Sequence, residues 1–98
     1  MKHLQEAISS STPTLVVFRH AGDDDAADIM SMVETLKAEY AGRANVISVD
    51  SSYNGNVKTH FKLREYPTWV LYKEGQELMR ESGKKSQAKL EEMIATAL

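Results

Sequence analysis

The sequence predicts an α/β fold in which helices flank a central, mixed four-stranded sheet, with the chain order α-β-α-β-α-β-β-α. An uninterrupted apolar run at 15–18 is typical of a strand that is covered on both faces. The segment after it repeats apolar residues three and four positions apart, which indicates an amphipathic helix. Near the C-terminus, Glu74-Gly75 separates two strand-like segments and predicts a hairpin. A β-α-β crossover followed by a hairpin gives a mixed sheet.

The first half of the chain supplies three elements. Residues 1–9 are expected to form a short helix, because Leu4 and Ile8 lie one turn apart. Pro13 ends that segment, and the β-branched residues of 15–18 favour a strand over a buried helical turn. The next helix begins near Asp24, with Asp23 or Asp24 as its N-cap and Gly42 as its stop. Its apolar face consists of Ile29, Met32, Val33, Leu36 and Tyr40.

The second half of the chain is expected to supply the remaining strands and two more helices. Strands are expected at 44–49, 68–72 and 76–80, a loop at 51–56 and a short helix at 57–62. Ser86 caps a final helix. The apolar face of that helix consists of Leu90, Met93, Ile94 and Leu98. Trp69 and Tyr72 are expected to pack in the core. Lys84-Lys85 is expected to form a solvated turn, and the alternative is that it rims a groove.

Composition narrows the functional classes. The 98 residues are expected to form one domain, 1–98, and a monomer. A net charge of -2 supplies no basic field for nucleic acid or for an anionic membrane. The chain has no cysteine, which excludes disulfides, thiolate metal sites and thiol catalysis. Without a signal-like or membrane-spanning apolar segment, the expected location is the cytoplasm. No cofactor is expected.

One stretch points to a known family. Residues 65–76 read Glu-Tyr-Pro-Thr-Trp-Val-Leu-Tyr-Lys-Glu-Gly-Gln, so that an X-Pro-Thr step enters an apolar strand that ends in an aromatic, Lys, an acid and Gly. With the order of elements, this pattern resembles the thioredoxin family over nearly the whole chain. The resemblance implies a thioredoxin-like fold and makes Pro67 the family's cis-proline. The other scaffold positions that match the family are Phe18, Glu39, Tyr40, Asp50 and Gly83.

The same resemblance shows which chemistry is missing. The family's Cys-Gly-Pro-Cys motif falls on the segment Asp23, Asp24, Asp25 and Ala26, and the Trp before it becomes Gly22. The family's buried acid becomes Val17, and its helix-kinking Pro becomes Ser31. Thiol–disulfide exchange needs an attacking thiolate and a second thiol. The sequence therefore predicts a redox-inactive member with no catalytic residues and no disulfide oxidoreductase activity.

The acidic segment at 23–25 has two interpretations. The first is a solvated loop that caps the following helix, since the helix dipole favours carboxylates there. The second is a Ca²⁺ or Mg²⁺ site, for which the candidate ligands are Asp23, Asp25, Asp28 and His20. Adjacent side chains diverge, so two of these ligands can converge on one point but four cannot. No metal is expected.

The remaining hypothesis concerns a peptide-binding groove. In thioredoxins, the residue before the cis-proline offers its backbone to an extended peptide. The resemblance therefore implies a groove at Gly22, Asp23, Tyr66, Pro67 and Gly83. We expect a protein-binding adaptor or chaperone-like module that uses it. The alternatives are metal binding by the acidic loop, and a structural subunit role in which the groove has no function. A non-redox enzyme would need a cluster of perturbed titratable groups, which the sequence does not indicate.

Overall fold

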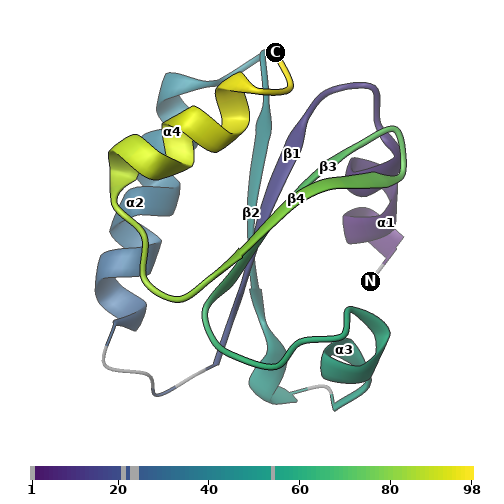
Figure 1. Cartoon of the computed structure of the whole chain (residues 1–98), viewed down its shortest axis with the longest axis vertical. Coiled ribbons are helices and arrows are strands. Elements are labelled where there is room, and N and C mark those ends of the chain that lie inside the picture. The colour runs from purple at the N-terminus through teal and green to yellow at the C-terminus, as the bar shows by residue number, and fades with distance from the viewer. Residues whose placement is uncertain (1, 21, 23–24, 54) are drawn as a thin grey trace.

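The computed structural model describes residues 2–20, 22, 25–53 and 55–98. The elements are α1 (Lys2–Ser9), β1 (Thr14–Arg19), α2 (Ala26–Glu39), β2 (Asn45–Asp50), a 3₁₀ turn (Ser51–Tyr53), α3 (Gly55–His60), β3 (Thr68–Lys73), β4 (Gln76–Ser82) and α4 (Gln87–Ala95). Figure 1 shows α2 and α4 on one side of the sheet and α1 and α3 on the other. The predicted fold class and order of elements are confirmed.

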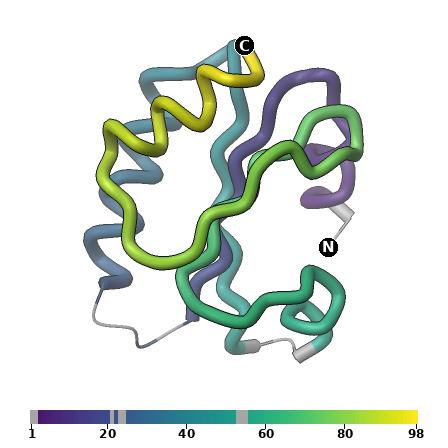
Figure 2. Tube along the Cα trace, viewed as in Figure 1, coloured from purple at the N-terminus to yellow at the C-terminus, as the bar shows by residue number. Residues whose placement is uncertain are grey.

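The sheet has the strand order β2-β1-β3-β4, so β1 and β3 are inner strands and β2 and β4 are the outer ones. The α2 crossover makes β1 and β2 parallel, whereas β1–β3 and β3–β4 are antiparallel. Val17 lies opposite Trp69, and Val70 lies opposite Arg80. The β3–β4 pairing shifts register between Leu71 and Tyr72, which leaves a bulge in β4. Figure 2 traces the path of the chain.

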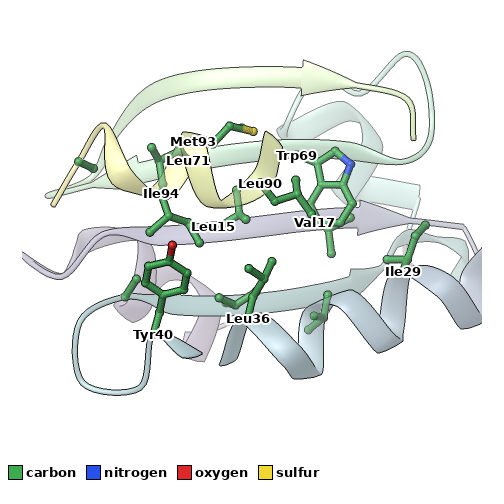
Figure 3. Packing of buried hydrophobic residues seen from close by; sticks show 14 residues of the cluster. Leu15, Val17, Ile29, Leu36, Tyr40, Trp69, Leu71, Leu90, Met93 and Ile94 are labelled. Atoms are coloured by element: carbon green, nitrogen blue, oxygen red, sulfur yellow. The ribbon is translucent and has the colours of Figure 1, made fainter. Parts of the chain in front are cut away.

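Strand β1 divides the core into two clusters. Leu15 and Val17 point towards α2 and α4, while Val16 and Phe18 point towards α1 and α3. Successive side chains on a strand face opposite sides, so a strand covered on both faces must be apolar throughout. All four of these residues are fully buried. Figure 3 shows the first cluster, in which Trp69 of β3 and Leu90 of α4 pack with Val17 and Leu15.

Two sequence-based details were wrong. The N-cap of α2 is Asp25 rather than Asp23 or Asp24, and its side chain makes no capping hydrogen bond. Residues 51–56 are not simply a loop, because they include the 3₁₀ turn and the start of α3. The Asp50 carboxylate accepts from the Ser52 backbone N–H at 2.9 Å, and the Ser51 hydroxyl donates to the Arg19 carbonyl at 3.0 Å. These polar side chains stabilise a turn where composition alone indicates an irregular loop.

A third detail concerns the C-terminus. Leu98 was expected on the apolar face of the last helix, but α4 ends at Ala95 and the Leu98 side chain is 58% exposed. The other three residues of that face, Leu90, Met93 and Ile94, are buried as expected.

The helices of the described ranges are all too short or too polar to cross a bilayer. Asp23 and Asp24 lie outside those ranges.

A matched pair of substitutions tests the position of the core. Leu90 is fully buried between α4 and the sheet, whereas Leu78 on β4 is 49% exposed. We expect Leu90→Ala to lower the free energy of unfolding by about 2–5 kcal/mol, because it leaves a cavity. The same change at Leu78 should cost about 0.5 kcal/mol or less. Urea unfolding measures both, and equal losses would contradict this packing.

Tyr72 gives the folded protein a sensitivity to high pH. Burial raises the pKa of its hydroxyl to about 12 from an ordinary value of 10.0, with a further contribution from Glu77 that Arg80 opposes. Below pH 10 the phenol is neutral in both the folded and unfolded states. Between pH 10 and pH 12 the unfolded chain ionises first, so stability falls as pH rises. We expect Tyr72→Phe to lose less stability over this range in chemical unfolding experiments.

Candidate functional site

Three loops meet at the end of the sheet where β1 finishes (Figure 1). They are the β1–α2 loop, of which His20, Gly22 and Asp25 are described, the α3–β3 loop at 61–67, and the β4–α4 loop at 83–86. We call this region the three-loop surface. Three contacts link the loops to one another: the His20 and Tyr66 rings, a hydrogen bond from Gly83 to Pro67, and an ion pair between Lys84 and Asp25.

Gly83 joins the β4–α4 loop to Pro67. Its N–H donates to the Pro67 carbonyl at 2.8 Å, and its carbonyl accepts from the Trp69 indole N–H at 3.1 Å. The Tyr66–Pro67 peptide bond is cis. Gly83 has a φ of +89°, which glycine adopts without strain, and a Cβ placed on it would meet nothing within 4 Å. The surface beside Gly83 is therefore open, while both of its backbone groups hold the loops together.

Tyr66 presents backbone groups with no partner in the described ranges. Its neighbours on both sides have theirs: the Glu65 carbonyl accepts from the Thr68 hydroxyl at 2.6 Å, and the Pro67 carbonyl accepts from Gly83. The Tyr66 ring is half-buried against the α1/α3 side of the core and lies 5.6 Å from the His20 ring. Packing thus fixes a residue whose N–H and carbonyl make no hydrogen bond within the described ranges.

Lys84 links the β4–α4 loop to the start of α2. Its ammonium lies 3.2 Å from Asp25 Oδ1 and 3.7 Å from Asp28 Oδ2, so it bridges the start of α2 and the β4–α4 loop. The hydrogen bond with Asp25 raises the pKa of Lys84, and the charges of Asp25 and Asp28 act in the same direction. Lys84 therefore stays cationic across the ordinary pH range. Its alkyl chain and ammonium form one rim of the three-loop surface.

The structure brings some predicted site residues together and leaves others undescribed. Tyr66, Pro67 and Gly83 lie on adjoining loops, and Gly22 forms an exposed turn in the third. Asp23, which belongs to both the groove and the metal hypotheses, lies outside the described residues. Among those that are described, no three metal-ligating side chains come together. Asp25 and Asp28 share the Lys84 ammonium, and the His20 ring lies against Tyr66.

The positions of the lost redox machinery hold ordinary structural residues. Val17, at the place of the family's buried acid, is fully buried in the apolar cluster beneath α2. Ser31, at the place of the helix-kinking proline, is an exposed residue within α2. Ala26 is the first residue of α2. None of these side chains can attack a disulfide or assist such an attack.

A sequence model of the thioredoxin family, described as "Thioredoxin", matches residues 2–96. The chain belongs to the thioredoxin family. Among curated relatives, Thioredoxin 1 of Synechococcus elongatus is 28% identical over 72 residues, which cover 74% of this chain and 67% of that protein. Chloroplastic Thioredoxin X of Arabidopsis thaliana is 29% identical over 89 residues, 89% of this chain and 49% of that protein.

Solved structures share the thioredoxin fold with this chain. A mutant thioredoxin from Halobacterium salinarum NRC-1 superposes with a TM-score of 0.86 at 22% identity, over 99% of this chain and 84% of that one. A designed protein superposes with a TM-score of 0.85 at 24% identity, over 98% and 85% of the two chains. This thioredoxin-family chain has no cysteine, so it lacks the thiols that thiol–disulfide exchange requires.

The sequence did not indicate the roles of two side chains at the three-loop surface. Trp69 was expected in the core, which its complete burial confirms, but its indole N–H also holds the Gly83 carbonyl. His20 was considered only as a metal ligand, whereas its ring packs beside Tyr66. Both roles depend on contacts between residues far apart in sequence, which no local pattern indicates.

The Lys84 bridge predicts a local effect without a global one. We expect Lys84→Met to change the amide NMR shifts of residues 25–29 and to leave the unfolding midpoint nearly unchanged, because exposed ion pairs add little stability. Lys85→Met is the matched control, since Lys85 pairs instead with Glu81 of the preceding strand β4. Equal shift changes at 25–29 for the two variants would contradict a bridge by Lys84.

Proposed function

We propose that this redox-inactive thioredoxin-family chain is a binding module that holds an extended peptide segment of another protein at the three-loop surface. It acts as an adaptor or chaperone-like holder. The observation that carries the proposal is the backbone of Tyr66, which has no hydrogen bond within the described ranges and is flanked by residues whose carbonyls are already paired. The loss of the thiols removes the family's chemistry and leaves the recognition surface.

The backbone of Tyr66 suits an extended ligand. One free N–H and one free carbonyl on the same residue can exchange two hydrogen bonds with a residue of an antiparallel strand. Adding a peptide strand to exposed backbone is a general mode of recognition, in which the main chain supplies affinity and nearby side chains supply specificity. The open space beside Gly83 gives that peptide room to pass.

Charge favours a basic or polar peptide. Asp25 and Asp28 lie at the rim, where the single ammonium of Lys84 serves both carboxylates. A Lys or Arg of the ligand can join Asp28, which is the more loosely held of the two, since its oxygen lies 3.7 Å from Lys84 Nζ. Exposed charge pairs are screened by salt, so binding should weaken as ionic strength rises.

The experiment is affinity capture from an extract of the source organism, followed by peptide mapping of the captured protein. We expect the unmodified chain to retain a partner that Gly83→Asn releases at least about tenfold more readily, because the added side chain fills the open space. Asparagine is chosen because it tolerates a positive φ better than other residues with a side chain.

Gly42→Asn is the matched control. Gly42 has a φ of +82° and the same open space around it, but it lies in the α2–β2 connection, away from the three-loop surface. Both variants should therefore lose similar stability, which thermal unfolding would verify. Equal capture by both variants would show that the partner uses a different surface. If Gly83→Asn and Gly42→Asn lose the partner equally, the cause is a folding defect, and this outcome also counts against binding at the three-loop surface.

A further inference from the structure

We propose a second binding site along the β4 edge of the sheet, which takes an extended acidic segment of a protein. Two adjoining hollows follow β4 on the side of α1 and α3. The first, of about 270 Å³, lies against Tyr72 and Gln5 and is called the Tyr72 hollow. The second, of about 480 Å³, reaches Arg64 and Ser82 and is called the Arg64 hollow. Lys62, Glu77 and Arg80 line both, so the two hollows adjoin along these three residues.

The Tyr72 hydroxyl can donate a hydrogen bond to a ligand. The side chain is only 6% exposed, and its ring packs with Phe61 and Ile8 in the α1/α3 cluster. Within the described ranges the hydroxyl has no hydrogen bond. Every fully buried side-chain N or O atom there has a partner, so this hydroxyl must open into the hollow. An accessible hydroxyl of this kind hydrogen-bonds to water in the free protein, and a ligand carboxylate can replace that water.

Lys62 places a cation at the junction of the hollows. It follows α3 with a φ of +56°, and the Leu63 N–H next to it donates to the Lys58 carbonyl at 2.9 Å. Glycine is the usual residue in this left-handed position after a helix, because a Cβ is disfavoured there. The chain keeps a lysine at the expense of some stability. Among the described residues, neither Lys62 nor Arg64 has a carboxylate within ion-pair distance.

Arg80 is fixed in place between the hollows. Its Nε and Nη2 donate to the Glu77 carboxylate at 3.0 and 2.9 Å, and its Nη1 donates to the Lys62 carbonyl at 3.4 Å. The hydrogen bonds from Arg80 hold the pKa of Glu77 below its usual range, so that carboxylate stays ionised. A guanidinium held this way is preorganised, and an incoming carboxylate need not order it.

The hydrogen-bond donors and cations around the hollows favour a negatively charged ligand. Three cations, Lys62, Arg64 and Arg80, face two carboxylates, Glu65 and Glu77, on a chain whose net charge is -2. Arg80 already neutralises Glu77, and the Tyr72 hydroxyl adds an uncharged donor. A ligand that brings carboxylate oxygens satisfies these groups, whereas a basic ligand would be repelled by Lys62 and Arg64.

The arrangement along the strand favours an extended segment over a small molecule. The hollows run from the level of Tyr72, opposite Glu77, to that of Thr68, opposite Ser82. The four residue steps from Thr68 to Tyr72 span about 13 Å, and alternate side chains of an extended peptide lie about 6.6 Å apart on one face. A segment with carboxylates at every second position can therefore place one in each hollow.

The test uses two synthetic octapeptides, one alternating Glu with Thr and one alternating Lys with Thr. We expect the acidic peptide alone to bind in isothermal titration calorimetry, with an affinity that falls as salt is added. Amide NMR shifts should move at 62–64, 72 and 77–80. Absence of binding by the acidic peptide, or equal binding by both peptides, overturns the proposal. Equally strong binding of glutarate or inorganic phosphate replaces it with a small-anion site.

Two variants locate the site without disturbing the fold. Tyr72→Phe removes a hydroxyl that has no partner in the described part of the free protein, so stability should be kept while affinity drops about tenfold. Lys62→Met should lower affinity about as much, whereas Lys37→Met removes the same charge from an exposed position on α2 and should leave binding intact. Unchanged affinity in Tyr72→Phe and Lys62→Met overturns the assignment.

Gly83→Asn separates this inference from the proposed function. The Arg64 hollow ends at Thr68 and Ser82, which are the neighbours of Pro67 and Gly83 in the sequence. We expect Gly83→Asn to bind the acidic peptide like the unmodified chain. Loss of that binding would place the peptide on the three-loop surface and overturn a separate site. Retention supports the second site whatever the outcome of the capture experiment.

Discussion

The constraint on which the rest of the structure depends is the burial of β1 on both faces. The four apolar residues 15–18 have no exposed side chain, so helices must cover each side of the strand and partner strands must flank it. The right-handed crossover through α2 then puts β2 on one flank, while β3, which follows α3, pairs antiparallel on the other. The last residue of β1 delivers the chain to the three-loop surface, at the end of the sheet where loops have to gather.

The three-loop surface is held by backbone and core, independently of any redox chemistry. Trp69 is fully buried in the core, and its indole N–H holds the Gly83 carbonyl. The Gly83 N–H in turn holds the Pro67 carbonyl. None of these links involves the positions at which other thioredoxins carry cysteines. The loops can therefore keep their arrangement after the thiols are gone, which is why loss of the chemistry need not mean loss of the surface.

Much of the fold could be predicted from the sequence, because its strongest signals are local. The apolar period of α2, the solid apolar run of β1 and the Glu74-Gly75 turn each define an element without reference to the others. The start of α2 was misplaced because several adjacent aspartates fit the N-cap equally well. Only the local backbone geometry distinguishes Asp25, which caps the helix without its side chain.

The sites depended on information that is not local. The groove residues came from the resemblance to thioredoxins and could not have come from composition or spacing. The Tyr72 and Arg64 hollows escaped sequence reasoning because they require the register that sets Tyr72 opposite Glu77. They also require the left-handed conformation of Lys62. Lysine is not a residue type from which a sequence predicts that conformation.

The two outer strands of the sheet differ in how readily a further strand could pair with them. Strand β4 carries charged side chains and a bulge, both of which discourage pairing with a foreign strand. Strand β2 pairs without a bulge along its whole length, and half-buried Ile47 and Val49 lie on it, with Asn45 and Asp50 only at its ends. Within the described chain nothing pairs with its outer side. That edge is where a further strand can join the sheet without displacing anything, and it is the edge to shield when the protein is concentrated or fused.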